Sequence, residues 1–510
     1  MDPDIRLKSS KGRWVLVATV LGSGVAFLDS TVVNVALPTI GRDFHATLAE
    51  LQWVVNAYTL TLAALILLGG SLGDRYGRRR VFVTGVIWFA VASALCAVAP
   101  DIQTLIVARA LEGIGGALLT PGSLAIIQAS FVQEDRPKAV GAWSGLGGVA
   151  GAIGPFLGGW LVSAAGWRWV FLINLPLAAM VVAVAVRHVP ETRDEGTRGR
   201  FDVRGAVLAA LALTGITYAL TEAPQPGIPK VAVAVAAVLG LACAAGFIVT
   251  ERTRTRAGDR EPMMRLDVFA SRQFTAVNVI TFVMYGGMGV VFFLFVVTLQ
   301  VVAGFSPIAA GASLVPATLL MLLLSARAGG LAQRIGPRIP MTVGLVVAAL
   351  GMVLMTRIGP HTSYLADVLP AVVVFGLGLC SVVAPLTATV LASADVRHAG
   401  MASGVNNAVA RAASLLFVAA IPPLAGLTGD AQAHPAMFLH GFREAILTSA
   451  GLLVLGAVLS LLTIRNDVLR AEPAVTPECK VCCPVGAPPL EPGAGQPPPG
   501  HRAAGASGAA

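Results

Sequence analysis

Three ionisable residues stand inside long apolar stretches of this sequence. Asp29 lies in the apolar run 14–37, and Arg109 and Glu112 lie three residues apart in the run 103–126. An ionised side chain inside a membrane costs roughly 2.5–3.5 kcal/mol even on lenient scales, so such residues are rare and usually functional. If the two runs cross a membrane in opposite directions, Asp29 lies about 12 Å from one surface, and Arg109 and Glu112 lie about 9 and 13 Å from it.

An Asp–Arg–Glu cluster at one depth has two readings. Arg109 and Glu112 share a helix face, because side chains three positions apart on a helix are neighbours. If the cluster faces a polar cavity, one carboxyl can accept a proton and change its ion pairing, which gives Asp29 a role in proton transfer. Alternatively, the cluster is a fixed buried ion pair that only sets the packing of two helices. We favour the proton role.

Composition indicates that the elements carrying these residues are membrane helices. Apolar residues make up 56% of the 510 positions, charged residues only 12%, and mean hydropathy is +0.78. Soluble proteins carry about 25% charged residues, so a soluble enzyme and a disordered chain are excluded, as is a barrel of alternating strands. Runs long enough to span a bilayer form groups of six, two and six: 14–37, 50–72, 81–100, 103–126, 138–163, 168–188; 205–222, 229–250; 274–299, 307–327, 339–358, 364–391, 399–424 and 440–464. The predicted fold is therefore an all-α integral membrane protein with fourteen transmembrane helices.

The distribution of basic residues predicts the orientation of these spans. With fourteen helices, 29 of the 36 Lys and Arg residues fall on the side that holds both chain ends, and five fall on the other. Cytoplasmic loops are enriched in Lys and Arg, so both termini are expected in the cytoplasm of a multi-pass inner-membrane protein. The net charge of +9 is explained in this way without a nucleic-acid partner. Six cysteines form no disulfide framework, and neither a metal site nor an organic cofactor is expected.

The chain also contains an internal repeat. Residues 70–79 (GSLGDRYGRR) and 329–338 (GGLAQRIGPR) share Gly, Leu, Arg, Gly and Arg at an offset of 259, each after the second helix of its six-helix group. Duplicated halves are a transporter architecture with the substrate site between them. The predicted organisation is a cytoplasmic N-terminus (1–13), an N-terminal bundle (14–188), a linker with two inserted helices (189–273), a C-terminal bundle (274–464) and a disordered tail (465–510).

Three further sets of residues are candidates for function. The first is the glycine-rich basic loop after the second helix, which we interpret as a conformational latch: Gly70, Gly73, Asp74, Arg75, Gly77, Arg78 and Arg79. The second, on the fifth helix, predicts close backbone contact with a partner helix and a proline bend: Gly151, Gly154, Pro155, Gly158 and Gly159. The third comprises polar and aromatic residues that either line a substrate cavity or form interhelical hydrogen bonds: Asn34, Gln52, Asn56, Tyr58, Asn278, Tyr285, Gln300, Asn406 and Arg411.

Several of these segments resemble motifs of one known family. LDSTVVNVALP (28–38), the loop 70–79, LIVARALEGIGGA (105–117), AGAIGPFLGG (150–159) and WRWVFLINLP (167–176) are similar to motifs of the major facilitator superfamily, in its 14-helix drug:proton antiporter branch of EmrB/QacA type. The resemblance covers about 14–465. Two residues depart from the motifs: Glu112 stands where the family usually has Gln, and Ala150 replaces a leading Gly.

The resemblance implies a functional monomer in the cytoplasmic membrane that exports drugs or toxic organic compounds, cationic or lipophilic, against inward protons. Such a protein would use alternating access, need no cofactor besides the proton gradient, and confer multidrug or antibiotic resistance. Asp29, Arg109 and Glu112 would then couple protons to transport. Alternatives are a dedicated exporter of one endogenous metabolite and a membrane sensor that does not transport. No hydrolase or P-loop motif points to an enzyme.

Overall fold

The computed structural model describes residues 5–193, 202–225, 227–257, 266–393, 399–429, 431 and 434–469. Within them the chain is helical, and the extended backbone pairing is limited to one bridge between Ile5 and Phe131. Thirteen described helices are long and apolar enough to cross a membrane. Helix α5 (Arg136–Ala165), whose side chains are described only in part, supplies one more span of the predicted fourteen. The predicted all-α membrane fold is confirmed.

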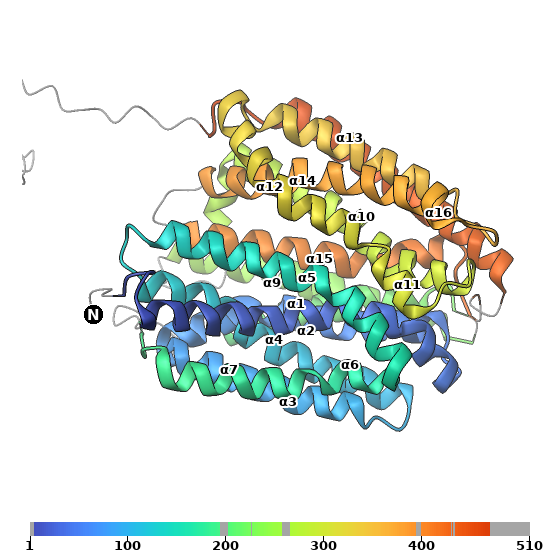
Figure 1. The fold of residues 1–510 in the computed structure, drawn as a ribbon, viewed down its shortest axis with the longest axis horizontal. Coiled ribbons are helices and arrows are strands. Elements are labelled where there is room, and N and C mark those ends of the chain that lie inside the picture. Colours follow the sequence, from blue (N-terminus) through green and yellow to red (C-terminus); the bar gives the residue numbers. More distant parts are fainter. Residues whose placement is uncertain are drawn as a thin grey trace, which may run out of the picture. The chain divides into compact units, whose positions relative to one another are not determined.

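The helices fall into two bundles joined by an inserted pair (Figure 1). The N-terminal bundle contains α1 (Ser10–Phe44), α2 (Leu48–Tyr76), α3 (Arg78–Ala97), α4 (Ile102–Ser130), α5, α6 (Arg168–Leu172) and α7 (Asn174–His188). The inserted pair is α8 (Val203–Glu222) and α9 (Lys230–Ala257). The C-terminal bundle contains α10 (Arg272–Val301), α11 (Pro307–Ala312), α12 (Val315–Ile335), α13 (Arg338–Met355), α14 (Leu369–Ala392), α15 (Ala399–Leu424) and α16 (Pro435–Thr463). A 3-10 turn (Leu266–Ala270) precedes α10, and a π-helical turn (Tyr364–Val368) precedes α14.

Capping residues make the helices longer than the apolar runs. Helix α1 begins four residues before the run 14–37 and ends seven after it. The Ser9 side chain accepts a hydrogen bond from the Gly12 N–H at 3.0 Å and so fixes the start of α1. At the start of α2, Thr47 and Glu50 form a reciprocal capping box. Polar caps outside the apolar core therefore set these helix ends.

Two of the predicted single spans are broken. The run 168–188 forms α6 and α7 with a break at Ile173, and the run 307–327 forms α11 and α12 with a break at Ser313 and Leu314. The break at Ile173 matters for the site below, because Asn174 begins the second segment there.

The duplicated loop has the same geometry in both bundles. Gly77 between α2 and α3 has φ +110°, and Gly336 between α12 and α13 has φ +90°, a left-handed conformation that favours glycine. A Cβ atom on Gly77 would lie 2.5 Å from Glu191 Oε1, and one on Gly336 would lie 2.6 Å from Asn466 Oδ1. Glu191 follows the last helix of the first bundle, and Asn466 follows the last helix of the second. The structure thus supports the internal repeat seen in the sequence.

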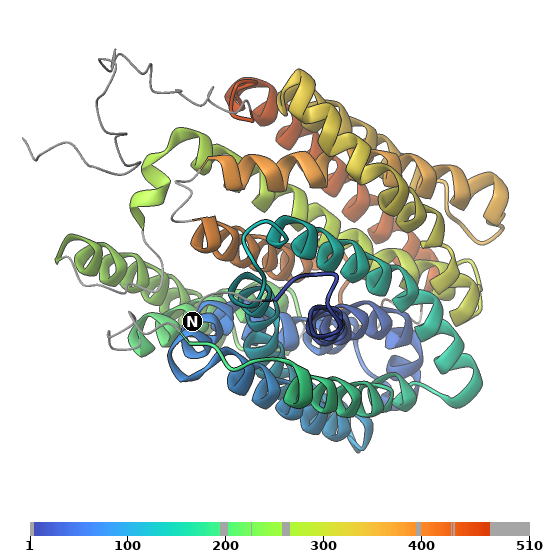
Figure 2. The same cartoon turned by 60° about the vertical axis from the view of Figure 1, so that its left-hand side comes forward.

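The inserted pair packs onto both bundles through α8. This helix contacts α2 of the first bundle and α15 of the second, whereas α9 packs mainly on α8. Trp53 of α2 donates from Nε1 to Glu222 Oε1 at 2.7 Å. Figure 2 shows the pair, in green, at the edge of the helix array. The inserted pair therefore lies at the edge of the interface between the two bundles.

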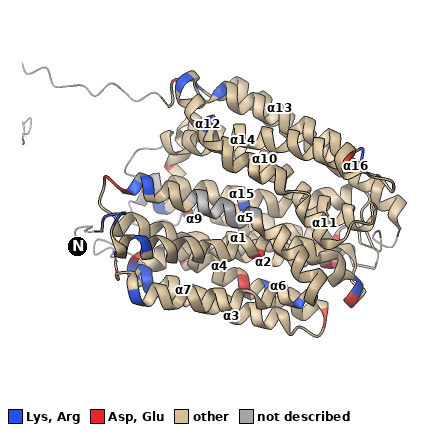
Figure 3. Cartoon of the chain, in the orientation of Figure 1, with Lys and Arg blue, Asp and Glu red and all other residues tan. Residues whose placement is uncertain are grey.

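Basic side chains gather at one end of the helices, where α1 begins (Figure 3). We call it the basic end, since it carries Arg75 and Arg78–Arg80. The two bundles are joined at the opposite end, where Gln52 of α2 donates to Val418 O of α15 at 2.7 Å. Gln300 of α10 likewise donates to Val35 O of α1 at 3.0 Å.

Candidate functional site

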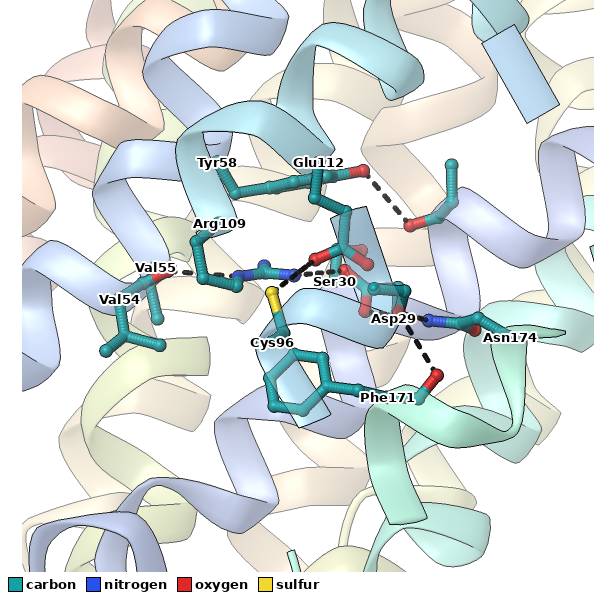
Figure 4. Close-up of polar contacts among 12 residues, drawn as sticks. Asp29, Ser30, Val54, Val55, Tyr58, Cys96, Arg109, Glu112, Phe171 and Asn174 are labelled. Carbon is teal, nitrogen blue, oxygen red and sulfur yellow. Dashed lines mark hydrogen bonds and ion pairs between the residues drawn. The ribbon is translucent and has the colours of Figure 1, made fainter. Parts of the chain in front are cut away.

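Asp29, Arg109 and Glu112 meet in one closed cluster inside the N-terminal bundle. Their side chains are at most 1% exposed. Arg109 Nη1 lies 2.6 Å from Asp29 Oδ2 and 2.5 Å from Glu112 Oε2, so one nitrogen serves both carboxylates (Figure 4). Helix α1 supplies the first acid, and α4 supplies the arginine and the second acid. The prediction that the three groups lie at similar depth agrees with this geometry.

Neighbouring helices hold the guanidinium in place. Arg109 Nε donates to the carbonyl oxygen of Val54 on α2 at 3.2 Å. The Arg109 Cζ atom lies 4.4 Å from the centroid of the Tyr58 ring and 5.7 Å from that of Phe171. A cation above an aromatic face is attracted by the ring quadrupole. The arginine is thus fixed by α1, α2, α4 and α6 together.

Three uncharged residues complete the cluster, and sequence reasoning did not assign them to it. Asn174 Nδ2 donates to Asp29 Oδ1 at 3.2 Å and to Ser93 Oγ at 2.9 Å. Cys96 Sγ lies 3.5 Å from Glu112 Oε2 and can donate its S–H. Cys96 is a small residue within the apolar run 81–100, and its thiol contacts an acid. The signal for Asn174 was its position as an amide inside an apolar run.

The charges of this cluster do not balance. It holds two carboxylates and one guanidinium, and the other ionisable groups among the described residues in contact with it are the Cys96 thiol and the Tyr58 phenol, both uncharged in their protonated form. Fully ionised, the site carries one excess negative charge in a closed apolar surrounding. Uptake of one proton by either carboxyl makes it neutral, so the geometry suits a reversible proton site.

The loop predicted as a latch is bound within its own bundle. Asp74 of α2 pairs with Arg78 at the start of α3, with Nη2 2.7 Å from Oδ1. Arg79 donates from its backbone N–H to Glu191 Oε1 at 3.1 Å and from Nη1 to the Val189 carbonyl at 3.1 Å. Glu191, which the sequence did not single out, thus joins the loop to the segment after α7. Gly70 and Gly73 have looser surroundings, with the nearest atoms to an added Cβ at 3.7 and 3.9 Å.

The glycines of α5 contact two different helices. A Cβ on Gly158 would lie 2.8 Å from Val32 Cγ1 of α1, and Gly154 faces Thr31 of the same helix. A Cβ on Gly159 would lie 2.5 Å from the backbone Cα of Ile308 in α11.

Pro155 of α5 meets Gly311 of α11, where an added Cβ would strike the Pro155 carbonyl group. The predicted close backbone contact is therefore made with α1 on one face and with α11 of the other bundle on another. Gly151 is in the part of α5 whose side-chain surroundings are outside the described residues.

The candidate cavity residues have different roles. Gln52 and Gln300 form the hydrogen bonds between bundles given above. Asn406 Nδ2 donates to Asn278 Oδ1 at 3.2 Å and to Thr281 Oγ1 at 2.8 Å, within the second bundle. Asn34 donates to Ser30 O at 3.3 Å in its own helix. Four of these candidates have a buried polar atom without a hydrogen-bond partner in the described chain: Asn34 Oδ1, Gln52 Oε1, Asn56 Nδ2 and Arg411 Nε.

Known proteins match this chain over most of its length. A family model described as Major Facilitator Superfamily matches residues 19–419. The multidrug resistance protein Stp of Mycobacterium tuberculosis (strain CDC 1551) is 36% identical over 400 residues, which are 77% of this chain and 72% of that protein. The puromycin resistance protein pur8 of Streptomyces alboniger is 33% identical over 476 residues, 90% of this chain and 92% of that one.

A solved structure carries the same fold. The POT family transporter PepTSo superimposes with a TM-score of 0.63 at 17% identity, covering 88% of this chain and 97% of that chain.

Proposed function

Because the chain belongs to the major facilitator superfamily, it is a multi-pass transporter of the cell membrane, and we propose that it exports drugs or toxic organic compounds in exchange for protons. Relatives named as multidrug and puromycin resistance proteins support export of this kind. The observation that carries the proton coupling is the buried pairing of Asp29 and Glu112 with a single nitrogen of Arg109. Resistance to several antibiotics is the expected phenotype.

The basic end is the cytoplasmic side in this proposal. Lys and Arg are enriched in cytoplasmic loops, and they gather where α1 begins (Figure 3). The contacts of α5 with α11, and of Gln52 and Gln300 across the bundles, then close the extracellular side. Export by alternating access requires these contacts to open after the compound has bound from the cytoplasm.

Protonation of Asp29 can affect the contacts that close the extracellular side, and helix α1 transmits the effect. Asp29 lies within one turn of Thr31 and Val32, which pack on the glycines of α5. Helix α5 in turn contacts α11 through Gly159. A proton on Asp29 weakens its attraction to Arg109 and releases the restraint between α1 and α4. A small shift of α1 then changes the packing of α5 against the second bundle.

The proton gradient supplies enough energy without another cofactor. One charge crossing 100 mV releases about 2.3 kcal/mol, and one pH unit adds about 1.4 kcal/mol. Each proton can thus sustain roughly a 500-fold gradient of a neutral compound. The proton cluster and the contacts between bundles all lie within one chain, so we propose that the monomer is the functional unit.

Inverted membrane vesicles test this function. Acidified inside, they should accumulate a xanthene dye such as fluorescein or rhodamine 123 when they carry the wild-type protein. Asp29→Asn should abolish this uptake, because the amide cannot exchange the proton. Asp43→Asn is the matched control, since Asp43 is an exposed residue near the end of the same helix. Full coupled uptake by Asp29→Asn would refute the assignment of the proton site.

A further inference from the structure

A second arginine, Arg411, lies at mid-depth in the other bundle. It stands twelve residues after the start of α15 and thirteen before its end. At 1.5 Å per residue it is about 18–20 Å from either end of the helix, near the centre of the membrane. Helix α15 packs against α10 of its own bundle and against α2 of the first bundle. Arg411 therefore stands on a helix at the junction of the two bundles.

No acidic residue neutralises Arg411 in the described part of the chain. Its side chain is half-buried, its Nε is buried without a hydrogen-bond partner, and it takes part in no ion pair there. Helices α2 and α10, on which α15 packs, carry Tyr58 and Tyr285, and among the described residues these two phenols influence its guanidinium. Helices α10 and α15 contain no Asp or Glu, and the acids of α2 and α8 stand near the helix ends.

Arg109 gives the contrast that makes this arrangement informative. Arg109, the arginine inside the first bundle, contacts two carboxylates and a carbonyl oxygen. Arginine stays protonated in proteins, and an unpaired charge at this depth is costly, so intramembrane arginines pair or serve a ligand. The planar guanidinium matches a carboxylate or another planar anion through two parallel hydrogen bonds. A planar anion from outside the chain can supply the counter-charge that Arg411 lacks among the described residues.

We propose that Arg411 is the anion-binding residue of the transport site, and that the exported compounds are organic anions with an aromatic body. The half-buried Tyr285, on the neighbouring helix α10, provides an aromatic side chain, and a carboxylate or phenolate of the compound provides the charge that the guanidinium lacks. The proposal rests on the export function proposed above and specifies its substrate class. The family resemblance implies cationic or lipophilic compounds, and the proposal departs from the cationic ones.

Two dyes with the same ring system and opposite charge test the proposal. Fluorescein carries a carboxylate and a phenolate, whereas rhodamine 123 is a cationic ester on the same xanthene scaffold. Binding to the purified full chain in nanodiscs is measured by fluorescence anisotropy. The wild-type protein should bind fluorescein at least tenfold more tightly than rhodamine 123. Equal or tighter binding of rhodamine 123 would overturn the proposal.

Variants of Arg411 test whether the preference for fluorescein depends on this residue. Arg411→Gln should weaken fluorescein binding at least tenfold without weakening rhodamine 123 binding. Arg411→Lys keeps the charge but loses the planar fork, so it should lose a smaller part of the affinity. Arg42→Gln, at an exposed arginine of α1, should change neither. Unchanged fluorescein binding by both Arg411 variants would overturn the proposal. Retained rhodamine 123 binding shows that a variant is folded.

Failure of the two proposals can be told apart. A wild-type protein that accumulates rhodamine 123 in acidified vesicles but does not bind fluorescein refutes the anion site and leaves the export function standing. A wild-type protein that binds fluorescein through Arg411 but accumulates neither dye supports the anion site and refutes proton-driven export.

Discussion

Arg109 holds two buried acids through one nitrogen, so its removal has a consequence that can be estimated from the structure. Arg109→Gln leaves Asp29 and Glu112 facing each other at 0% exposure without a cation. Removing one partner of a buried ion pair costs about 3–5 kcal/mol. The cation–π contact with Tyr58, at 4.4 Å, is also lost and adds up to about 2 kcal/mol.

A triple variant separates these two contributions. Asp29→Asn, Arg109→Gln and Glu112→Gln together remove every charge while keeping side chains of similar size that can form hydrogen bonds. Replacing a whole buried ion cluster is often close to neutral, so the triple variant should lose only the contribution of about 2 kcal/mol from the Tyr58 ring. We therefore expect it to be about 3–5 kcal/mol more stable than Arg109→Gln alone.

Unfolding of the purified protein in detergent at pH 8 measures this difference. A thiol-reactive dye is a suitable probe, because Cys96 is buried beside Glu112 and becomes reactive when the cluster opens. Arg443→Gln is the matched control, since Arg443 is exposed and donates to the Thr356 carbonyl, a bond worth about 1 kcal/mol. If Arg109→Gln were as stable as the triple variant, the acids would not need the cation, and the argument from charge balance would be refuted.

Two further predictions concern the closure between bundles and the start of α4. Gly159→Ala places a methyl group 2.5 Å from the backbone of Ile308, so α5 should separate from α11. Proteoliposomes that contain this variant should then leak protons without substrate. Gly141→Ala, on the same helix but with open space around it, should cause no proton leak. The hydrogen bond from the Thr104 N–H lowers the pKa of Asp101. Protection of the Thr104 amide in hydrogen exchange should therefore persist above about pH 4 and disappear as the pH falls through that lowered pKa. Protection that is unchanged at pH 2 would contradict this prediction.

Hydropathy and charge were sufficient to predict the helices but not their ends. Long apolar runs must become helices in a membrane because no other backbone partner exists there. The ends depend on polar caps such as the box of Thr47 and Glu50, in which Thr47 lies before the apolar run and Glu50 is its first residue. The break at Ile173 carries no charge, glycine or proline at its own position, so the pattern gave no sign of it.

The charged part of the cluster could be predicted, whereas its uncharged part could not. Asp29, Arg109 and Glu112 stand out because charge is rare in apolar runs, and counting residues places them at one depth. Ser93 and Cys96 are small residues that also occur on lipid-facing or tightly packed surfaces. Whether their side chains face the cluster depends on the rotation of α3 about its own axis. Glu191 lies in a charged connecting segment, where nothing in the sequence distinguishes it from its neighbours.

The sign of the charge at Arg411 restricts how protons and substrate can be coupled. A cation would compete directly with a proton for the acids near Arg109. An anion at Arg411 would instead be favoured by protonation of that cluster, because its excess negative charge would then vanish. Direct electrostatic competition therefore has the wrong sign for exchange of an anion against protons. The coupling must pass through helix packing, and the contact of α1 with α5, and of α5 with α11 at Gly159, is the route by which Asp29 reaches the second bundle.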